Sequence, residues 1–103
     1  MSREIGDNPI VRISVALPSA LGRVEAASFR GQLLVAFDQQ ESVVIDCSRA
    51  GSLPALWVQL LCSAAASAQA RQLSVILKGI SEQCRGSFAG LGIDLAASPL
   101  VLE

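Results

Sequence analysis

The sequence predicts a single α/β domain with a mixed, mostly parallel sheet of four to five strands and helices mainly on one face. Short runs rich in β-branched residues alternate along the chain with longer segments of helical spacing, which is typical of strand–helix–strand units. The 103 residues are 51% apolar and 17% charged, which suffices for one hydrophobic core. No linker, repeat or low-complexity tract interrupts them, so we expect residues 1–103 to form one domain.

Three segments have the composition of strands, and a fourth is a candidate. Ile10–Leu17 alternates apolar and polar residues until Pro18 ends it. Ser42–Cys47 and Leu73–Leu77 are dense in β-branched and aliphatic residues, as in central strands covered on both faces. A short edge strand is a further expectation at Pro99–Leu102.

The spacing of apolar residues predicts three helices, over Arg23–Phe37, Leu53–Arg71 and Ser81–Leu91. In the first helix, the apolar positions at helical spacing are Val24, Ala27, Phe29, Leu33, Leu34 and Phe37. Pro54 lies near the first turn of the second helix, where the missing N–H has no helical partner to lose. Ser81 is expected to cap the third helix, and Gly92 is expected to end it.

The charge pattern excludes several classes of function. Eight basic and nine acidic residues give a formal charge of −1 without a basic cluster, so no nucleic-acid partner is expected. The absence of histidine removes the commonest general base and most protein zinc sites. Asp46, Glu25 and Glu82 are single carboxylates without a partner at a catalytic spacing. We therefore expect no enzymatic activity, no catalytic residue, no metal site and no cofactor.

The cysteines and the N-terminal segment indicate a compartment. Cys47, Cys62 and Cys84 form no Cys-x-x-Cys pair, so they are interpreted as free structural thiols. Only Cys84, which precedes Arg85, is a candidate for reactivity. The segment MSREIGDNP lacks the apolar core of a signal peptide, and no apolar run approaches the roughly 18 residues of a membrane span. We expect a cytoplasmic protein without membrane insertion.

The turn after the second predicted strand, Asp46–Trp57, carries the most informative motif. In open α/β sheets, binding sites lie where strands end and helices begin. The run VVIDCSRAGSLPALWVQLL resembles the strand, loop and helix of STAS domains, the sulfate-transporter and anti-sigma-factor-antagonist family. Asp46-Cys47-Ser48 is similar to the Asp-Leu-Ser that ends this strand in the family, and Phe88-Ala-Gly-Leu-Gly-Ile93 is similar to its closing helix. The resemblance covers nearly the whole chain and implies the STAS fold.

The same resemblance contains a departure at the phosphorylation site of the family. Counting eight residues on from Asp46 places Pro54 at the family's acidic position. Ala55 then stands where antagonists carry the serine or threonine that their partner kinase phosphorylates. Neither residue accepts a phosphate, so the resemblance implies that the usual charge switch is absent. If the alignment with the family is shifted at this loop, Ser52 becomes the phospho-acceptor candidate.

Two further motifs are similar to a STAS subtype without the phospho-acceptor that is encoded in bacterial chemotaxis clusters. LPSALGRVEAA at Leu17–Ala27 resembles its first half, and LWVQLLCSAAA at Leu56–Ala66 resembles its alanine-rich helix. The similarity implies a non-enzymatic interaction module in bacterial signal transduction, linked to chemotaxis. Two alternatives from the family stay open: a cytoplasmic STAS subunit of a lipid-transporting ABC complex, and an anti-sigma factor antagonist phosphorylated on Ser52.

The expected partner-binding surface is the loop after the second strand and the start of the second helix. Helical spacing places Leu56 and Leu60 at the border of the core stripe, where either a neighbouring helix or a partner covers them. Trp57 lies either in the core or at the interface. The residues expected to bind a bacterial signalling protein (a chemotaxis component, a kinase or an anti-sigma factor) are Arg49, Ser52, Pro54, Ala55, Leu56, Trp57 and Leu60. A homodimer is a further alternative, because a small domain cannot hide all of its apolar surface.

Overall fold

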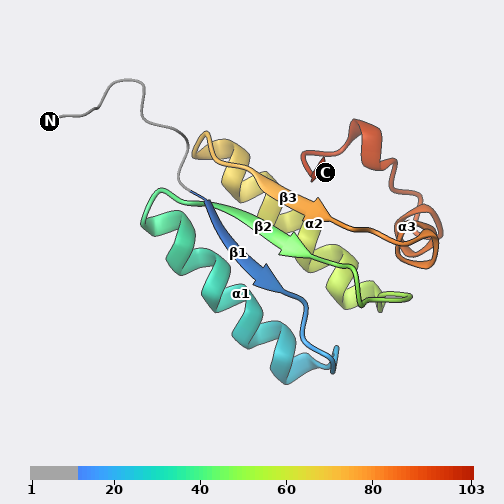
Figure 1. The fold of residues 1–103 in the computed structure, drawn as a ribbon. Coiled ribbons are helices and arrows are strands. Elements are labelled where there is room, and N and C mark those ends of the chain that lie inside the picture. The colour runs from blue at the N-terminus through green and yellow to red at the C-terminus, as the bar shows by residue number, and fades with distance from the viewer. Residues whose placement is uncertain (1–11) are drawn as a thin grey trace, which may run out of the picture.

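The computed structural model describes residues 12–103, in which strands and helices alternate. The elements in chain order are β1 (Arg12–Ala16), α1 (Arg23–Asp38), β2 (Ser42–Asp46), α2 (Ala55–Ala70), β3 (Val75–Lys78), α3 (Glu82–Ala89), the 3-10 turn η1 (Leu95–Ala97) and β4 (Val101–Leu102). All predicted strands and helices are present (Figure 1). Ile10 and Val11, which the sequence assigns to the first strand, lie outside the described residues. Within residues 12–103, no helix has the length and apolar character needed to span a membrane.

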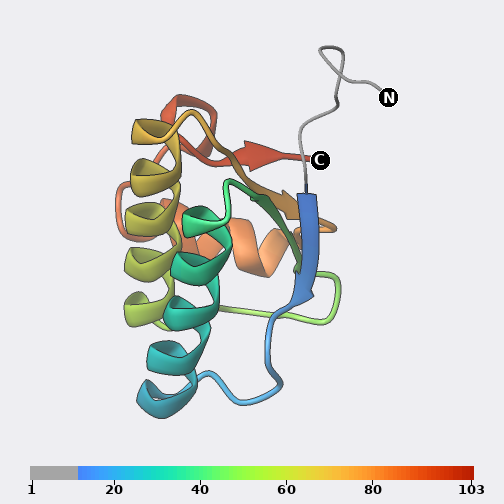
Figure 2. The ribbon, with the colours of Figure 1, turned by 90° about the vertical axis from the view of Figure 1, so that its left-hand side faces the viewer.

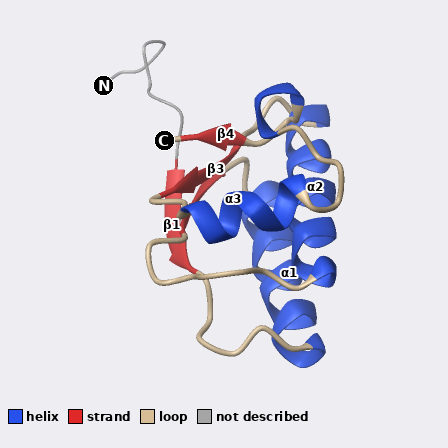
Figure 3. Cartoon of the chain, turned by 90° about the vertical axis from the view of Figure 1, so that its right-hand side faces the viewer, coloured by secondary structure: helices blue, strands red, loops and turns tan. Residues whose placement is uncertain are grey.

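The four strands form one sheet in the order β1-β2-β3-β4, and each neighbouring pair is parallel. One row across this sheet consists of Ser14, Val44, Ile76 and Val101. Crossovers between parallel strands are right-handed, so strands that follow one another in chain order place their connecting helices on the same face. Figures 2 and 3 show α1 and α2 on that one side of the sheet, with α3 at its carboxyl end. The predicted fold class is confirmed.

α2 begins two residues later than the sequence predicts. Pro54 is its N-cap, with an extended backbone (φ −61°, ψ 153°), instead of a residue of the first turn. The residue before a proline is sterically biased away from the helical region, so Leu53 stays in the loop. The N–H groups of Trp57 and Val58 both donate to the Pro54 carbonyl, and this starts the helical hydrogen bonding.

β3 also begins two residues later than predicted, because the end of α2 uses the intervening chain. Gln72 adopts a positive φ of 61°. The Leu73 N–H then donates back to the Ala68 carbonyl at 2.7 Å, which is the return bond of a Schellman ending. Leu73 thus completes the helix ending, and the strand starts at Val75. α1 ends in the same way, with Gln40 at a φ of 62°.

The buried face of α1 includes only part of the apolar positions predicted at helical spacing. Its buried residues are Ala26, Phe29, Leu33, Ala36 and Phe37, of which Phe29, Leu33 and Phe37 were predicted. Val24 is 79% exposed, Ala27 is exposed as well, and Leu34 is half-buried. Apolar residues occur on both sides of this helix, so periodicity alone does not determine which side is buried.

One continuous core lies between the helices and the sheet. Trp57 is its largest member and has no exposed area. Its ring centroid lies 5.3 Å from that of Phe29, and its indole N–H donates to the Gly22 carbonyl at 3.3 Å. The residues that α2 buries are Trp57, Val58, Leu61, Ala65 and Ala68. The inward side chains of α2 are therefore large at its start, with Trp57, and small towards its end, with Ala65 and Ala68.

Candidate functional site

The loop between β2 and α2, residues 47–54, lies past the carboxyl end of the sheet (Figure 1). Its first turn is held locally, because the Asp46 carboxylate accepts a hydrogen bond from the Ser48 N–H at 2.9 Å. The Cys47 N–H donates to the Lys78 carbonyl of β3 at 2.8 Å. The chain therefore leaves the sheet in a fixed direction.

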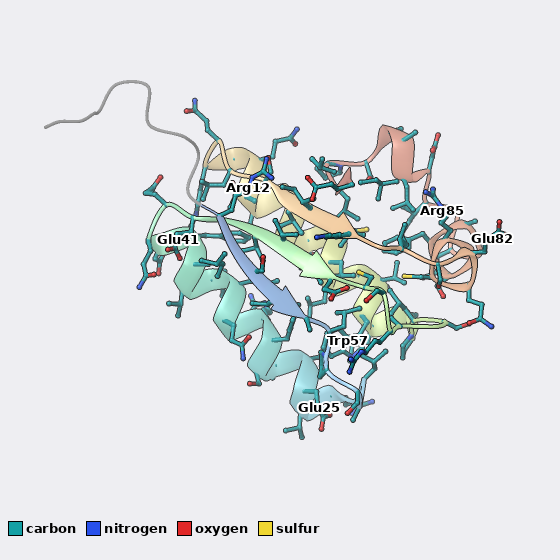
Figure 4. All side chains as sticks on the ribbon, in the orientation of Figure 1. Arg12, Glu25, Glu41, Trp57, Glu82 and Arg85 are labelled. Atoms are coloured by element: carbon teal, nitrogen blue, oxygen red, sulfur yellow. The ribbon has the colours of Figure 1, made fainter. Side chains whose placement is uncertain are left out.

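Asp46 stabilises this turn as an exposed anion. Hydrogen bonds from Ser48 hold the pKa of Asp46 below its ordinary value of 3.8, and the positive charges of Lys78 and Arg49 act in the same direction. Glu25 and Glu82 lie in the first turns of α1 and α3, well apart from each other in Figure 4. In the described part of the chain, no three His, Cys, Asp or Glu side chains form a group that could hold a metal ion.

Two serines of the α3 region fix the rest of the loop. Ser81, the N-cap of α3 as predicted, accepts from the Cys84 N–H and donates to the Ala50 carbonyl, both at 3.1 Å. Ser87 accepts from the Leu53 N–H at 2.7 Å. The loop is therefore held in its middle and at its end by a helix distant in sequence. A loop that is already ordered loses less conformational entropy when it binds.

This bonding leaves a short group of side chains facing solvent at the start of α2. Arg49, Ser52, Pro54 and Ala55 are exposed, and Leu56 is 43% exposed. We call these five residues the loop surface. They belong to the set that the sequence predicts to bind a partner, and they come from the fixed loop and the first turn of the helix.

The other two residues of the predicted set are placed differently. Trp57 has no exposed area, so the core interpretation of this residue is the one that holds, and it does not reach a partner in this conformation. Leu60 is half-buried and faces α1. The cause is the helical turn of about 100° per residue, which directs Trp57 inward while Leu56 stays outward.

Leu56 and Leu60 line a groove of about 480 Å³ between α1 and α2, which we call the α1–α2 groove. Its lining residues are Arg23, Ala26, Ala27, Arg30, Leu33, Leu34 and Phe37 from α1, and Leu56, Gln59, Leu60, Ser63, Ala64 and Ser67 from α2. α1 partly covers Leu60, as the first alternative expects, whereas Leu56 stays accessible and its contact with a partner remains a prediction.

The α1 side of this groove was missed from the sequence. Arg23, Arg30 and Leu34 are spaced by seven and four residues, so they share one face of the helix. That spacing was an available signal. What the sequence does not contain is the position of α2 beside this face.

The three thiols do not belong to the loop surface and have low accessibility. Cys47 and Cys84 have no exposed area, and Cys62 is half-buried. A hydrogen bond with Cys84, together with burial, raises the pKa of the Cys47 thiol. Burial also raises the pKa of Cys62. A hydrogen bond with Cys47 and the charge of Arg85 lower the pKa of Cys84, but its sulfur is closed off from solvent, so the reactivity of this candidate stays a prediction.

The fold is shared with known proteins. A family model described as "Mlab, STAS domain" matches residues 8–102, which is nearly the whole chain. A solved structure of a serine-to-glutamate variant of Moorella thermoacetica RsbS superposes with a TM-score of 0.74 at 20% identity. That match covers 95% of this chain and 86% of the other. No curated protein matches the chain. At this level of identity, the structural likeness concerns the fold and not the site.

Proposed function

The chain belongs to the STAS domain family, and from this membership we propose that it is a non-enzymatic protein–protein interaction module in bacterial signal transduction. The loop surface carries the proposal. Pro54, Ala55 and Leu56 form an exposed uncharged run on a loop that α3 holds in place. Contiguous apolar surface on a fixed loop is typical of a protein interface.

We further propose that binding is not switched by phosphorylation at the family's usual position. The count from Asp46 places Ala55 there, and Ala55 has no hydroxyl group. A phosphate adds about −1.5 to −2 charges, so a residue that cannot carry one cannot provide this switch. Binding is then constitutive or regulated at another position.

The proposed partner is a cytoplasmic bacterial signalling protein, with a chemotaxis component as the first candidate. This choice rests on the similarity of Leu17–Ala27 and Leu56–Ala66 to the chemotaxis-cluster subtype. A kinase or an anti-sigma factor is the second candidate, and the RsbS fold supports a signalling role of this general kind. In the transport alternative, the same loop surface binds the ATPase subunit of a lipid-transporting ABC complex.

Leu56→Asp tests the proposal. Leu56 is 43% exposed, so a carboxylate at this position keeps its contact with water and the fold persists. The apolar contact with the partner is lost, and we expect the captured partner to fall at least about tenfold. The measurement is affinity capture from a lysate of the source bacterium, read by mass spectrometry. Val35→Asp is the matched control, because Val35 is 56% exposed and does not line the α1–α2 groove.

Chemotaxis receptors, kinase or response regulators enriched by wild type and Val35→Asp, but not by Leu56→Asp, would support the proposal. An ABC-transporter ATPase or a sigma-regulating kinase in their place would promote the corresponding alternative. Circular dichroism checks the fold of each variant. If Leu56→Asp unfolds, Leu56 is a core residue and its placement at the interface is wrong.

One observation favours the phosphorylated antagonist as a second function. Ser52 is exposed on the loop surface, and a kinase therefore has access to its hydroxyl. Incubation with a serine kinase and intact-mass measurement decides between the two: addition of one phosphate to wild type, and none to Ser52→Ala, would establish the antagonist function and contradict the unswitched module.

A further inference from the structure

The α1–α2 groove has charge of only one sign. Arg23 and Arg30 lie on its α1 side, and no aspartate or glutamate lines it. The two arginines are seven residues apart, which is two helical turns or about 10.5 Å along the axis. The side-chain ion pairs formed within residues 12–103 are Arg12–Glu103 and Arg71–Asp38. Neither groove arginine therefore has a carboxylate partner among these residues.

α2 contributes no charge to this surface. None of its 16 residues, Ala55–Ala70, is acidic or basic. Its polar side chains in the groove are Gln59, Ser63 and Ser67, all of which are exposed. A helix on the surface of a domain ordinarily carries charged residues on its water-facing side. Small, uncharged side chains lose less hydration free energy when they are covered, so this face is suited to burial under a partner.

The floor of the groove is apolar and elongated. Its apolar lining includes Leu33, Leu34, Phe37, Leu56, Leu60 and Ala64. α1 and α2 connect parallel strands of one sheet and therefore run side by side in the same direction (Figures 1 and 2). The channel between two such helices accepts a third helix, whose apolar side chains at positions i, i+3, i+4 and i+7 enter it.

A second copy of this chain does not fit the groove in a symmetric contact. A two-fold interface places the same patch against itself. A symmetric contact would then bring four groove arginines into one interface whose two linings contain no carboxylate. Like charges brought together out of water are destabilising. The occupant must therefore supply the negative charge.

We propose that the α1–α2 groove binds an acidic amphipathic helix of the partner protein, with apolar side chains between α1 and α2 and two carboxylates one heptad apart opposite Arg23 and Arg30. The inference rests on the proposed function, since it specifies the part of the signalling partner that this module recognises. Leu56 belongs to both the groove and the loop surface, so the two surfaces are continuous.

Site-specific photo-crosslinking of the full chain tests this. One variant carries p-benzoylphenylalanine at Ser63, inside the groove, and a second carries it at Ser52, on the loop surface. A third carries it at Val35, which is exposed on α1 outside the groove. Each is expressed in the source bacterium and irradiated, and the crosslinked peptides are sequenced by mass spectrometry. We expect the Ser63 variant to capture a segment with acidic residues seven apart and apolar residues at helical spacing, and the Val35 variant not to capture it.

Charge reversal supplies the second readout. Arg30→Glu in the Ser63 variant should lower the yield of that crosslink at least about tenfold, because the variant sets a carboxylate against the partner's carboxylates. Arg85→Glu is the matched control, since Arg85 is an exposed arginine on α3 and does not line the groove. It should leave the yield unchanged.

The outcomes separate the two claims. Capture by the Ser52 variant but not by the Ser63 variant keeps the proposed function and overturns the groove inference. Capture by neither variant overturns both. A Ser63 crosslink to this chain itself, to a lipid or to a segment without acidic residues overturns the inference. An equal loss of crosslink yield for Arg30→Glu and Arg85→Glu also overturns the groove inference, because the effect of charge would then not depend on a position in the groove.

Discussion

Trp57 joins the start of α2 to the start of α1. Its ring packs on Phe29, and its indole N–H donates to the carbonyl of Gly22, the N-cap of α1. We predict that Trp57→Phe lowers the free energy of unfolding by about 1–3 kcal/mol, because a partly buried hydrogen bond and part of a buried ring are lost. Urea denaturation measures this, with Val35→Ala as a surface control. A loss below about 0.5 kcal/mol, the usual level of a surface substitution, would contradict the core role of Trp57.

Asp46 makes the turn at the end of β2 sensitive to acid. Because its pKa is lowered in the folded chain, its contribution to stability is complete above the ordinary value of 3.8. That contribution is lost as the pH falls through the lower, folded value. We predict that Ser48→Ala raises the pKa of Asp46 part of the way towards 3.8, since the side-chain hydrogen bond from Ser48, the largest cause of the shift, is lost while the backbone N–H bond of residue 48 remains. Carboxyl NMR titration measures the pKa, with Ser52→Ala as the control; an unchanged value in Ser48→Ala would refute this explanation.

At the scale of the elements, α2 ends on a residue poorly suited to its backbone conformation. Gln72 has a φ of 61°, a region that favours glycine because a β-carbon is strained there. We predict that Gln72→Gly raises the free energy of unfolding by about 0.5–1 kcal/mol, because the strain removed exceeds the entropy that glycine adds to the unfolded chain. Gln69→Gly, inside α2, is the control and should lower it by about 1 kcal/mol. Destabilisation by Gln72→Gly would show that the glutamine side chain stabilises the turn.

The four strands and the three α-helices could be predicted from the sequence, but the turn η1, several boundaries and part of the buried face of α1 could not. β-branched runs indicated β2 and β3, and the Ser81 cap of α3 was correctly predicted. The start of α2 was misplaced because Pro54 serves as the N-cap. The start of β3 was misplaced because Gln72 and Leu73 complete the ending of α2. Both errors come from local backbone geometry that apolar periodicity does not encode.

For the whole molecule, the candidate site could be predicted only where it is local in sequence. Arg49 to Leu56 follow a recognisable strand ending, so the loop surface was accessible to sequence analysis. The α1–α2 groove could not be predicted from the sequence, because it forms only where α1 and α2 lie side by side on one face of the sheet. The serine contacts that hold the loop were missed for the same reason: Ser87 and Leu53 are 34 residues apart in the chain.

The central claim is that the loop surface and the α1–α2 groove together form the partner-binding surface. Hydrogen–deuterium exchange tests it most directly, by comparing the free chain with the chain saturated by its captured partner. We predict slower exchange on binding over 23–37 and 49–67, and no change in β1 or β4. Slower exchange confined to β1, β4 or the sheet face without helices, with 23–37 and 49–67 unaffected, would contradict the account.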